Sequence, residues 1–214
     1  MTRTAVTVDH QASLRAAVAK LTAEFGDRID GETIERLVLS SYESMAKTAT
    51  VTNFLPLLAE KFARQRLRAV DREHNPAGAT RRPMVLFLCV KNAGRSQMAL
   101  GFLQHHAGDR VLGMSGGSAP GGSIDPVAVE VMAEKGIDVT GEFPKPWTDE
   151  ILRVSDVIVT MGCGDECPVL PGKSYVDWEL TDPAGKDIEV VRGIRDDIER
   201  RVLSLIDELV PANV

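Results

Sequence analysis

The spacing of apolar residues divides the chain into a helical first part and a second part in which strands and helices alternate. In the first 73 residues apolar side chains recur every three or four positions, which is the period of an amphipathic helix. The three helical segments cover residues 14–25, 34–45 and 54–67. Gly26 ends the first segment, and Thr52 or Asn53 is the expected N-cap of the third. We therefore expect residues 1–73 to form a small three-helix bundle.

Residues 74–83 interrupt every periodic pattern, because they contain two prolines, a glycine and small polar residues, as a linker does. From residue 84 onward, short apolar runs alternate with amphipathic segments. The expected strands cover residues 84–88, 111–114, 157–161 and 175–178, and the expected helices cover residues 97–106, 126–135, 148–153 and 190–209. Fully apolar strands in this order predict an α/β fold. We expect a parallel four-stranded sheet flanked by helices over residues 84–214.

Composition and charge narrow the class of protein. The chain has 214 residues, 43% hydrophobic and 26% charged, which is typical of a globular protein. No apolar run approaches the roughly 20 residues of a membrane span, and the polar start does not resemble a signal peptide. Residues 81–214 carry 14 basic and 21 acidic side chains, which argues against nucleic acid as a partner. With three cysteines and no export signal, we expect a cytoplasmic protein whose thiols perform chemistry.

A C-x5-R pattern stands at the end of the first expected strand, where Cys89 is followed by Arg95. Backbone N–H groups of such a loop, together with the start of the next helix, can converge on an anion. The arginine supplies a planar fork for two anion oxygens, and the same field favours a nucleophilic thiolate at Cys89. The residues expected to bind the oxyanion are Val90, Lys91, Asn92, Ala93, Gly94, Arg95 and Ser96. A buried strand cysteine before an ordinary helix cap is the alternative, and it leaves Arg95 unexplained.

Two further segments follow strands in the expected sheet. Cys163 and Cys167 come directly after the strand that ends near Met161, on the same rim as Cys89. Thiol–disulfide exchange with Cys89 is favoured over inert structural cysteines, and too few ligands are present for a closed zinc site. Asp182 precedes a proline that holds it in extended geometry. Beside an anion pocket this carboxyl group would act as a general acid, although an Asp-Pro turn is common by itself.

Three separated motifs resemble those of the arsenate reductases built on the low-molecular-weight phosphatase fold. The motifs are residues 89–99, the strand-then-cysteine segment that ends at residue 168, and residues 182–185. They occur in the family's order, and the resemblance covers residues 84 to about 208. It implies reduction of arsenate to arsenite without a bound cofactor. Cys89 would attack arsenic, Arg95 and the loop amides would hold the oxyanion, and Asp182 would protonate the departing oxygen.

The resemblance also implies a route for the electrons. In thioredoxin-coupled members a second thiol displaces arsenite by forming a disulfide with the nucleophile, and a third presents that disulfide to thioredoxin. Cys163 and Cys167 would fill these two roles. Asn92 and Ser96 match positions that shape the loop and favour the thiolate. Similar N-terminal extensions in actinobacterial relatives imply that the bundle forms a homodimer.

Departures from the family pattern keep alternatives open. Only three residues separate Cys163 and Cys167, whereas six separate them in the best-known members. This short spacing is similar to that of relatives that use a small thiol of the mycothiol type with a glutaredoxin-like partner. Leu100 stands where several members carry a potassium-binding glutamate, so we expect no metal ion. A tyrosine phosphatase of the same fold is a second alternative, although such enzymes typically carry an aromatic residue where Ala184 stands. The third is a non-enzymatic oxyanion sensor with a partner-binding or DNA-binding bundle.

Overall fold

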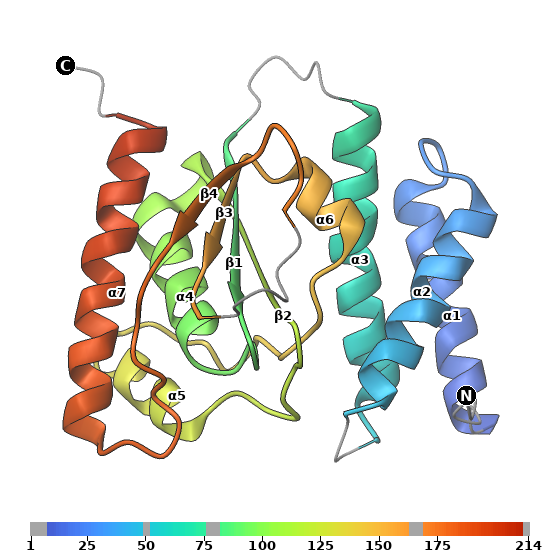
Figure 1. The fold of residues 1–214 in the computed structure, drawn as a ribbon. Helices are drawn as coiled ribbons and strands as arrows, with labels where there is room; N and C mark the ends of the chain where they lie inside the picture. Colours follow the sequence, from blue (N-terminus) through green and yellow to red (C-terminus); the bar gives the residue numbers. More distant parts are fainter. Residues whose placement is uncertain (1–7, 49–51, 76–81, 163–168, 212–214) are drawn as a thin grey trace. The chain divides into compact units, whose positions relative to one another are not determined.

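The computed structural model describes residues 8–48, 52–75, 82–162 and 169–211. The chain divides into two compact units, Met1–Gly78 and Ala79–Val214, and each is described by itself. In Figure 1 the first unit runs from blue to blue-green, and the second continues from green to red.

The N-terminal unit consists of three helices, α1 (Val8–Phe25), α2 (Gly31–Ala46) and α3 (Leu55–His74). Apolar residues at helical spacing point inward from all three, and Leu21, Ile34 and Phe62 are completely buried. The Asp30 side chain caps α2 by accepting a hydrogen bond of 2.8 Å from the N–H of Thr33. The three-helix arrangement expected over residues 1–73 is therefore present in the described residues.

The expected cap of the third helix was wrong. Phe54, rather than Thr52 or Asn53, occupies the N-cap position of α3, and it makes no side-chain capping bond. Pro56 lies in the first turn and has no N–H, so fewer donors at this helix start need a partner. The carbonyl of Thr52 accepts the N–H of Leu55 at 3.0 Å, which closes a turn ahead of the helix instead.

The second unit is built on a parallel four-stranded sheet, with the strand order β2-β1-β3-β4. The strands are β1 (Met84–Cys89), β2 (Leu112–Gly117), β3 (Val157–Thr160) and β4 (Ser174–Asp177). Every residue of β1 is buried, as expected for a central strand covered on both faces. The register pairs Cys89 with Gly117 and Leu88 with Thr160, so these residues share the carboxyl edge of the sheet. The expected α/β class and strand arrangement are confirmed.

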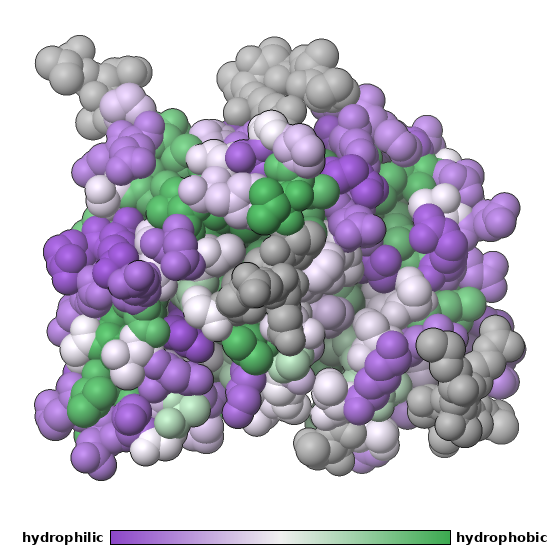
Figure 2. Space-filling view, viewed as in Figure 1, coloured by the Kyte–Doolittle hydropathy of each residue, from purple (hydrophilic) through white to green (hydrophobic). Residues whose placement is uncertain are grey.

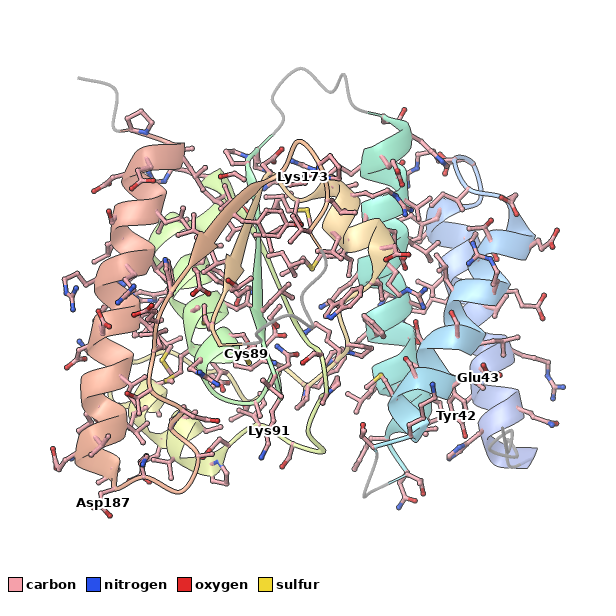
Figure 3. All side chains as sticks on the ribbon, in the orientation of Figure 1. Tyr42, Glu43, Cys89, Lys91, Lys173 and Asp187 are labelled. Atoms are coloured by element: carbon pink, nitrogen blue, oxygen red, sulfur yellow. The ribbon has the colours of Figure 1, made fainter. Side chains whose placement is uncertain are left out.

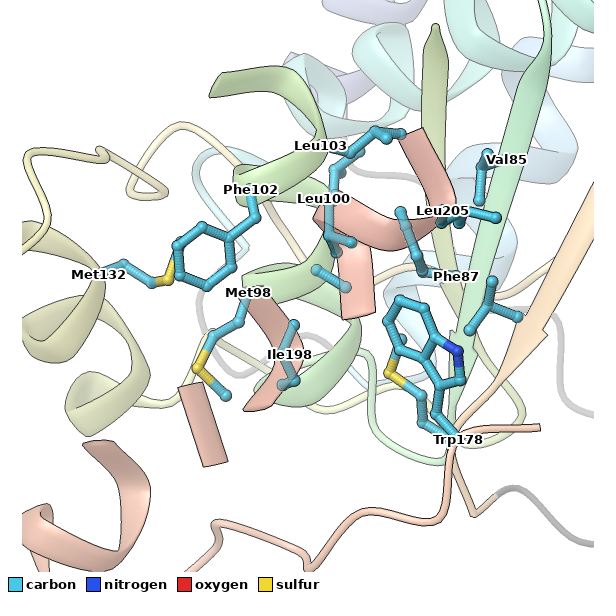
Figure 4. Close-up of a cluster of buried hydrophobic side chains, with 14 of the residues drawn as sticks. Val85, Phe87, Met98, Leu100, Phe102, Leu103, Met132, Trp178, Ile198 and Leu205 are labelled. Atoms are coloured by element: carbon cyan, nitrogen blue, oxygen red, sulfur yellow. The ribbon is translucent and has the colours of Figure 1, made fainter. Parts of the chain in front are cut away.

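Helices cover both faces of this sheet (Figure 1). They are α4 (Arg95–Ala107), α5 (Pro126–Ala133), α6 (Asp149–Val154) and α7 (Ile188–Leu209), with a short 3-10 helix at Gly108–Arg110. Figure 4 shows the main core, where Phe87 and Trp178 pack against apolar residues of α4 and α7. The two rings lie 5.8 Å apart in a tilted arrangement. The alternate residues of β1, including Leu86, are buried outside this core cluster, because successive side chains of a strand point to opposite faces of the sheet. Figure 1 shows α6 on that other face.

Strand β2 extends three residues beyond its expected end at residue 114. The prediction ended too early because the glycines in this part of the strand carry no hydropathy signal. A β-carbon at Gly116 would lie 2.9 Å from the backbone of Trp147, and one at Gly117 would lie 2.6 Å from the carbonyl oxygen of Val90. Only glycine therefore allows the neighbouring backbone to approach the end of β2 this closely.

Among the helices of the described ranges, none combines the length and apolar character that crossing a bilayer requires. In the view of Figure 2, hydrophilic residues gather along the outer side of α7. The large hydrophobic residues that α7 leaves exposed are Val190 and Leu203. This distribution is typical of an amphipathic surface helix.

Candidate active site

The loop between β1 and α4 surrounds the sulfur of Cys89 with polar groups. Cys89 is the last residue of β1, and it is 3% exposed at the carboxyl edge of the sheet. Its Sγ accepts the backbone N–H of Asn92 at 3.2 Å and lies 3.0 Å from Oγ of Ser96. Donors of this kind stabilise a thiolate more than a thiol. Arg95 begins α4 directly after the loop, so the expected C-x5-R motif spans the strand end and the helix start.

The carbonyl groups of the loop are held by the segment that follows β2. Four loop carbonyls accept backbone N–H groups of this segment, at 3.3 Å for Cys89 and 2.9 Å for each of Val90, Lys91 and Ala93. The donors are Ser118, Ala119, Gly121 and Asp125. In a trans peptide the next N–H points opposite to the carbonyl. The N–H groups that follow these four carbonyls are therefore turned away from the backing segment, as an oxyanion cradle requires.

Asn92 organises the base of the loop. It is completely buried and has a φ of 48°, a left-handed conformation that asparagine tolerates better than most residues. Its Oδ1 accepts the N–H of Lys145 at 3.0 Å and Nε2 of Gln97 at 3.2 Å. Its Nδ2 donates to Oγ of Ser96 at 2.9 Å. Because Ser96 already accepts this bond, its hydroxyl hydrogen is available to point at the Cys89 sulfur.

The guanidinium of Arg95 lies between the loop and the segment that carries Asp182. It is 7% exposed, and its Nη1 donates to the carbonyl of Leu180 at 3.1 Å. Its Nη2 lies 3.5 Å from Oδ2 of Asp182, whose side chain is 59% exposed. The expected acid and the expected anion-binding fork are therefore neighbours. Asp182 also accepts the N–H of Ala184 at 3.2 Å, which fixes the Asp-Pro turn.

Cys89, Arg95 and Asp182 line one pocket of about 230 Å³. Its walls come from the loop, from the segment before α5 and from the Asp-Pro turn, namely Cys89, Lys91, Ala93, Gly94, Arg95, Gly121, Gly122, Ser123, Ile124, Asp125, Pro126, Asp182, Pro183 and Ala184. A β-carbon at Gly94 would lie 2.9 Å from Cγ of Pro183, so the Asp-Pro turn packs directly on the loop. Lys91 is exposed beside the pocket, and Figure 3 shows it near Cys89 at the lower end of β1.

Cys163 and Cys167 lie outside the described residues, so the relay roles expected for them stay predictions. Gly162, the last described residue before them, has a φ of 70°. A β-carbon there would lie 3.0 Å from Nη1 of Arg95, so Gly162 lies beside the guanidinium. No group of three or more His, Cys, Asp or Glu side chains in the described part of the chain could hold a metal ion.

Sequence reasoning missed three parts of the site: Gln97, Lys145 and the backing segment 118–125. Nε2 of Gln97 donates to the carbonyl of Asn92 at 3.0 Å and to that of Phe143 at 3.2 Å. The backing segment could have been inferred, because it follows an expected strand, and the carboxyl ends of parallel strands reach the same edge of a sheet. No pattern signals Lys145, which meets Asn92 across 53 residues of sequence.

The family model for low molecular weight phosphotyrosine protein phosphatases matches residues 84–213, and a model for the N-terminal domain of protein-tyrosine-phosphatase-like proteins matches residues 14–71. The chain belongs to the low molecular weight phosphatase family. A putative arsenate reductase of Halobacterium salinarum is 39% identical over 130 residues, which are 58% of this chain and 92% of that protein. The glutaredoxin arsenate reductase of a Synechocystis species is 33% identical over 128 residues, covering 58% of this chain and 97% of the relative.

One solved structure extends the similarity to both units. The thioredoxin-dependent arsenate reductase of Corynebacterium glutamicum is 41% identical and superposes with a TM-score of 0.84. The match covers 94% of this chain and 98% of that one. Within the phosphatase family, the resemblance to arsenate reductases inferred from the three motifs is therefore confirmed.

Proposed function

We propose that the protein reduces arsenate to arsenite with Cys89 as the nucleophile. The observation that carries this proposal is the position of the Cys89 sulfur. It lies in a loop whose carbonyls are turned outward, within reach of the Asn92 N–H and Ser96 hydroxyl. Arsenate is a tetrahedral oxyanion, so the amides and the Arg95 fork supply the donors that it needs. The names of the similar proteins support arsenate as the substrate.

The reaction follows from these groups. The Cys89 thiolate attacks arsenic, and one arsenic–oxygen bond breaks while Asp182 protonates the departing oxygen to give water. The Cys163 thiolate then attacks the Cys89 sulfur. The sulfur–arsenic bond breaks, its electron pair stays on arsenic, and arsenite leaves. Two thiols are thereby oxidised to a disulfide, which matches the two electrons that arsenate gains.

Thioredoxin is the reductant that we propose. The Corynebacterium glutamicum protein named thioredoxin-dependent covers both units of this chain, whereas the two curated relatives cover only 58% of it. Cys167 would exchange with Cys163 and present the disulfide to thioredoxin. A relay of free thiols needs a reducing compartment, so we place the protein in the cytoplasm.

A phosphatase activity is the competing function, because phosphate and arsenate have nearly the same shape and the family is named for phosphotyrosine. Ala184 follows the Asp-Pro pair, and no aromatic side chain lines the pocket formed by the described residues. A phosphotyrosine ring would therefore lack an aromatic partner at the mouth of the pocket. This favours a free oxyanion over an aryl phosphate.

Peptide mapping after a single turnover tests the proposed route. The reduced protein is mixed with one equivalent of arsenate, quenched with acid and digested without reductant. We expect one equivalent of arsenite and a Cys163–Cys167 disulfide, and in Cys167→Ser a Cys89–Cys163 disulfide instead. Three intervening residues allow a turn that brings two Cα atoms within the ~4.4–6.8 Å of a disulfide. Rapid turnover of p-nitrophenyl phosphate without arsenite formation would point to the phosphatase instead.

The same peptide mapping, carried out with a competing small thiol present, identifies the reductant. Thioredoxin coupling requires that the disulfide remain within the chain. A mixed disulfide between Cys89 and the added thiol, with no internal disulfide, would replace thioredoxin by a small-thiol system and make Cys163 and Cys167 dispensable.

We also propose that the N-terminal unit forms a homodimer. In this unit the large apolar side chains of Leu39, Phe54 and Leu57 are exposed by 40%, 64% and 50%. A cavity of about 440 Å³ between α1 and α2 is lined by Leu14, Val18 and Leu39 with three polar residues. A second copy of this chain would cover such a surface by two-fold symmetry.

Sedimentation velocity at micromolar concentration tests the dimer. We expect the full chain to sediment as a dimer, and a chain lacking residues 1–80 to sediment as a folded monomer. Leu39→Glu should weaken the dimer by placing a charge in the apolar surface, whereas the conservative Leu39→Met should leave it intact. A full-length chain that sediments as a monomer would refute the proposal.

A further inference from the structure

Lys145 is buried directly behind the active-site loop, and the reaction proposed above makes no use of it. Its side chain is 1% exposed, and no other lysine of the described residues is buried. Nζ lies 3.4 Å from each of three oxygens, which are Oγ of Ser115, the carbonyl of Phe143 and Oε2 of Glu142. It also lies 4.6 Å from the centre of the Phe143 ring. All three polar contacts are long for hydrogen bonds, so the ammonium is held by its surroundings together rather than by one strong bond.

A buried ammonium has to be explained, because it gives up hydration that these contacts replace only in part. Burial lowers the pKa of Lys145, and the nearby Glu142 carboxylate opposes that change. Glu142 is the one charged group that the described structure places against Nζ. An apolar side chain of similar length would fill the same space without losing hydration. Stability alone therefore does not account for a lysine at this position.

The backbone around Lys145 holds the base of the loop. Its N–H donates to Oδ1 of Asn92 at 3.0 Å, and its carbonyl accepts the N–H of Gly117 at 2.9 Å. The carbonyl of Phe143, which contacts Nζ, also accepts Nε2 of Gln97 at 3.2 Å. Residues 142–147 thus contact the loop through backbone groups, and they contact β2 both through backbone bonds at Gly117 and through the ammonium at Ser115.

We propose that Lys145 is a positioning residue for the nucleophile. Its ammonium adds a side-chain contact at Ser115 to the backbone bonds at Gly117, and together they fix residues 142–147 against β2. The backbone of this segment then holds the Asn92 amide and, through Ser96, aims a hydroxyl hydrogen at the Cys89 sulfur. This inference rests on the proposed role of Cys89 as the nucleophile. Lys145 itself does not contact Cys89 in the described structure.

The direction of the hydrogen bonds explains how Lys145 affects Cys89 without contacting it. Asn92 accepts from Lys145 and Gln97 on its oxygen, so its nitrogen must face Ser96. Ser96 then has one acceptor site filled, and its own hydrogen can donate to sulfur at 3.0 Å. If residues 142–147 move away from β2, Asn92 loses its main anchor. The amide can then rotate, and the donation to the thiolate is lost.

The pH dependence of Cys89 alkylation tests the proposal without arsenate. Iodoacetamide reacts with the thiolate, and peptide mapping follows Cys89 alone. In Lys145→Met, which keeps the length but removes the ammonium, we expect the midpoint of the alkylation rate to move about one pH unit upward. At a pH below both midpoints the rate would then fall roughly tenfold. Lys145→Gln, whose amide can still donate to Ser115 and Phe143, should show a smaller shift in the same direction.

Lys173→Met is the matched control. Nζ of Lys173 donates to the backbone carbonyls of Arg153 and Ser155, so this variant also removes a lysine that holds backbone oxygens. Lys173 precedes β4 and lies at the opposite end of the sheet from Cys89 (Figure 3). We expect its alkylation midpoint to equal that of the wild type.

The outcomes separate this inference from the proposed function. If Lys145→Met does not fold, as judged by circular dichroism, Lys145→Gln is assessed by the same criterion. Midpoints that coincide with the wild type would overturn the positioning role, even if arsenate turnover falls. A wild type that shows the expected midpoint and shift but makes no arsenite would instead overturn the proposed reaction and leave the role of Lys145 standing.

Discussion

Cys89→Ser should abolish arsenite formation, a loss of more than about 10⁴-fold, as is typical when a catalytic nucleophile is removed. A serine hydroxyl stays protonated at neutral pH in this pocket, so it cannot attack arsenic as the thiolate does. It also cannot form the disulfide that carries the two electrons. Arsenite measured in a single turnover gives the result independently of any reductant. Detectable turnover by this variant would exclude Cys89 as the nucleophile.

Two controls make the result specific. Cys167→Ser should still produce one equivalent of arsenite and then stop, because Cys89 and Cys163 suffice for the chemical step. The serine hydroxyl at position 89 can accept the Asn92 N–H as the sulfur does, so the loop should keep its shape. Phosphate should therefore still bind to Cys89→Ser in a calorimetric titration. In the wild type, phosphate or arsenate should protect Cys89 from alkylation.

The reacting half of the site could be predicted because its signals are local. Cys89 ends a strand whose six residues are all apolar and buried, and Arg95 begins the helix six residues later. A strand, a loop and a helix that are adjacent in sequence place nucleophile and anion-binding groups together without long-range information. The parallel sheet, though not the order of its strands, followed from the alternation of strands and helices, since apolar strands in this pattern are typical of a parallel sheet covered on both faces.

The supporting half could not be predicted, because its contacts join distant segments. Asn92 is held by Lys145 across 53 residues, and the loop carbonyls are held by residues after β2. The end of β2 was missed because Gly116 and Gly117 carry no hydropathy signal, although close packing on Trp147 and Val90 requires them. The predicted N-cap of α3 was wrong because Pro56 changes which N–H groups at the helix start need a partner.

Asp182 is placed to affect the chemical step more than arsenate binding, because it contacts Arg95 but lies outside the loop that would hold the anion. Its side chain is 59% exposed, so the contact of 3.5 Å with Arg95 contributes only about 0–1 kcal/mol to stability. Replacing Asp182 should therefore leave the fold intact. Arg95, in contrast, is buried at the start of α4. Arg95→Lys removes the planar fork and should weaken both arsenate binding and the chemical step.

Asp182→Asn should slow the chemical step by roughly 10²- to 10⁴-fold while arsenate binding stays close to that of the wild type. Asparagine keeps an oxygen that can accept the Ala184 N–H, so the turn is preserved, but it has no proton to give the departing oxygen. Single-turnover arsenite formation measures this step directly. Asp187→Asn is the matched control, because Asp187 precedes α7, makes no side-chain capping bond and lies outside the pocket lining. Equal rates for Asp182→Asn and the wild type across the pH range would mean that another group supplies the proton.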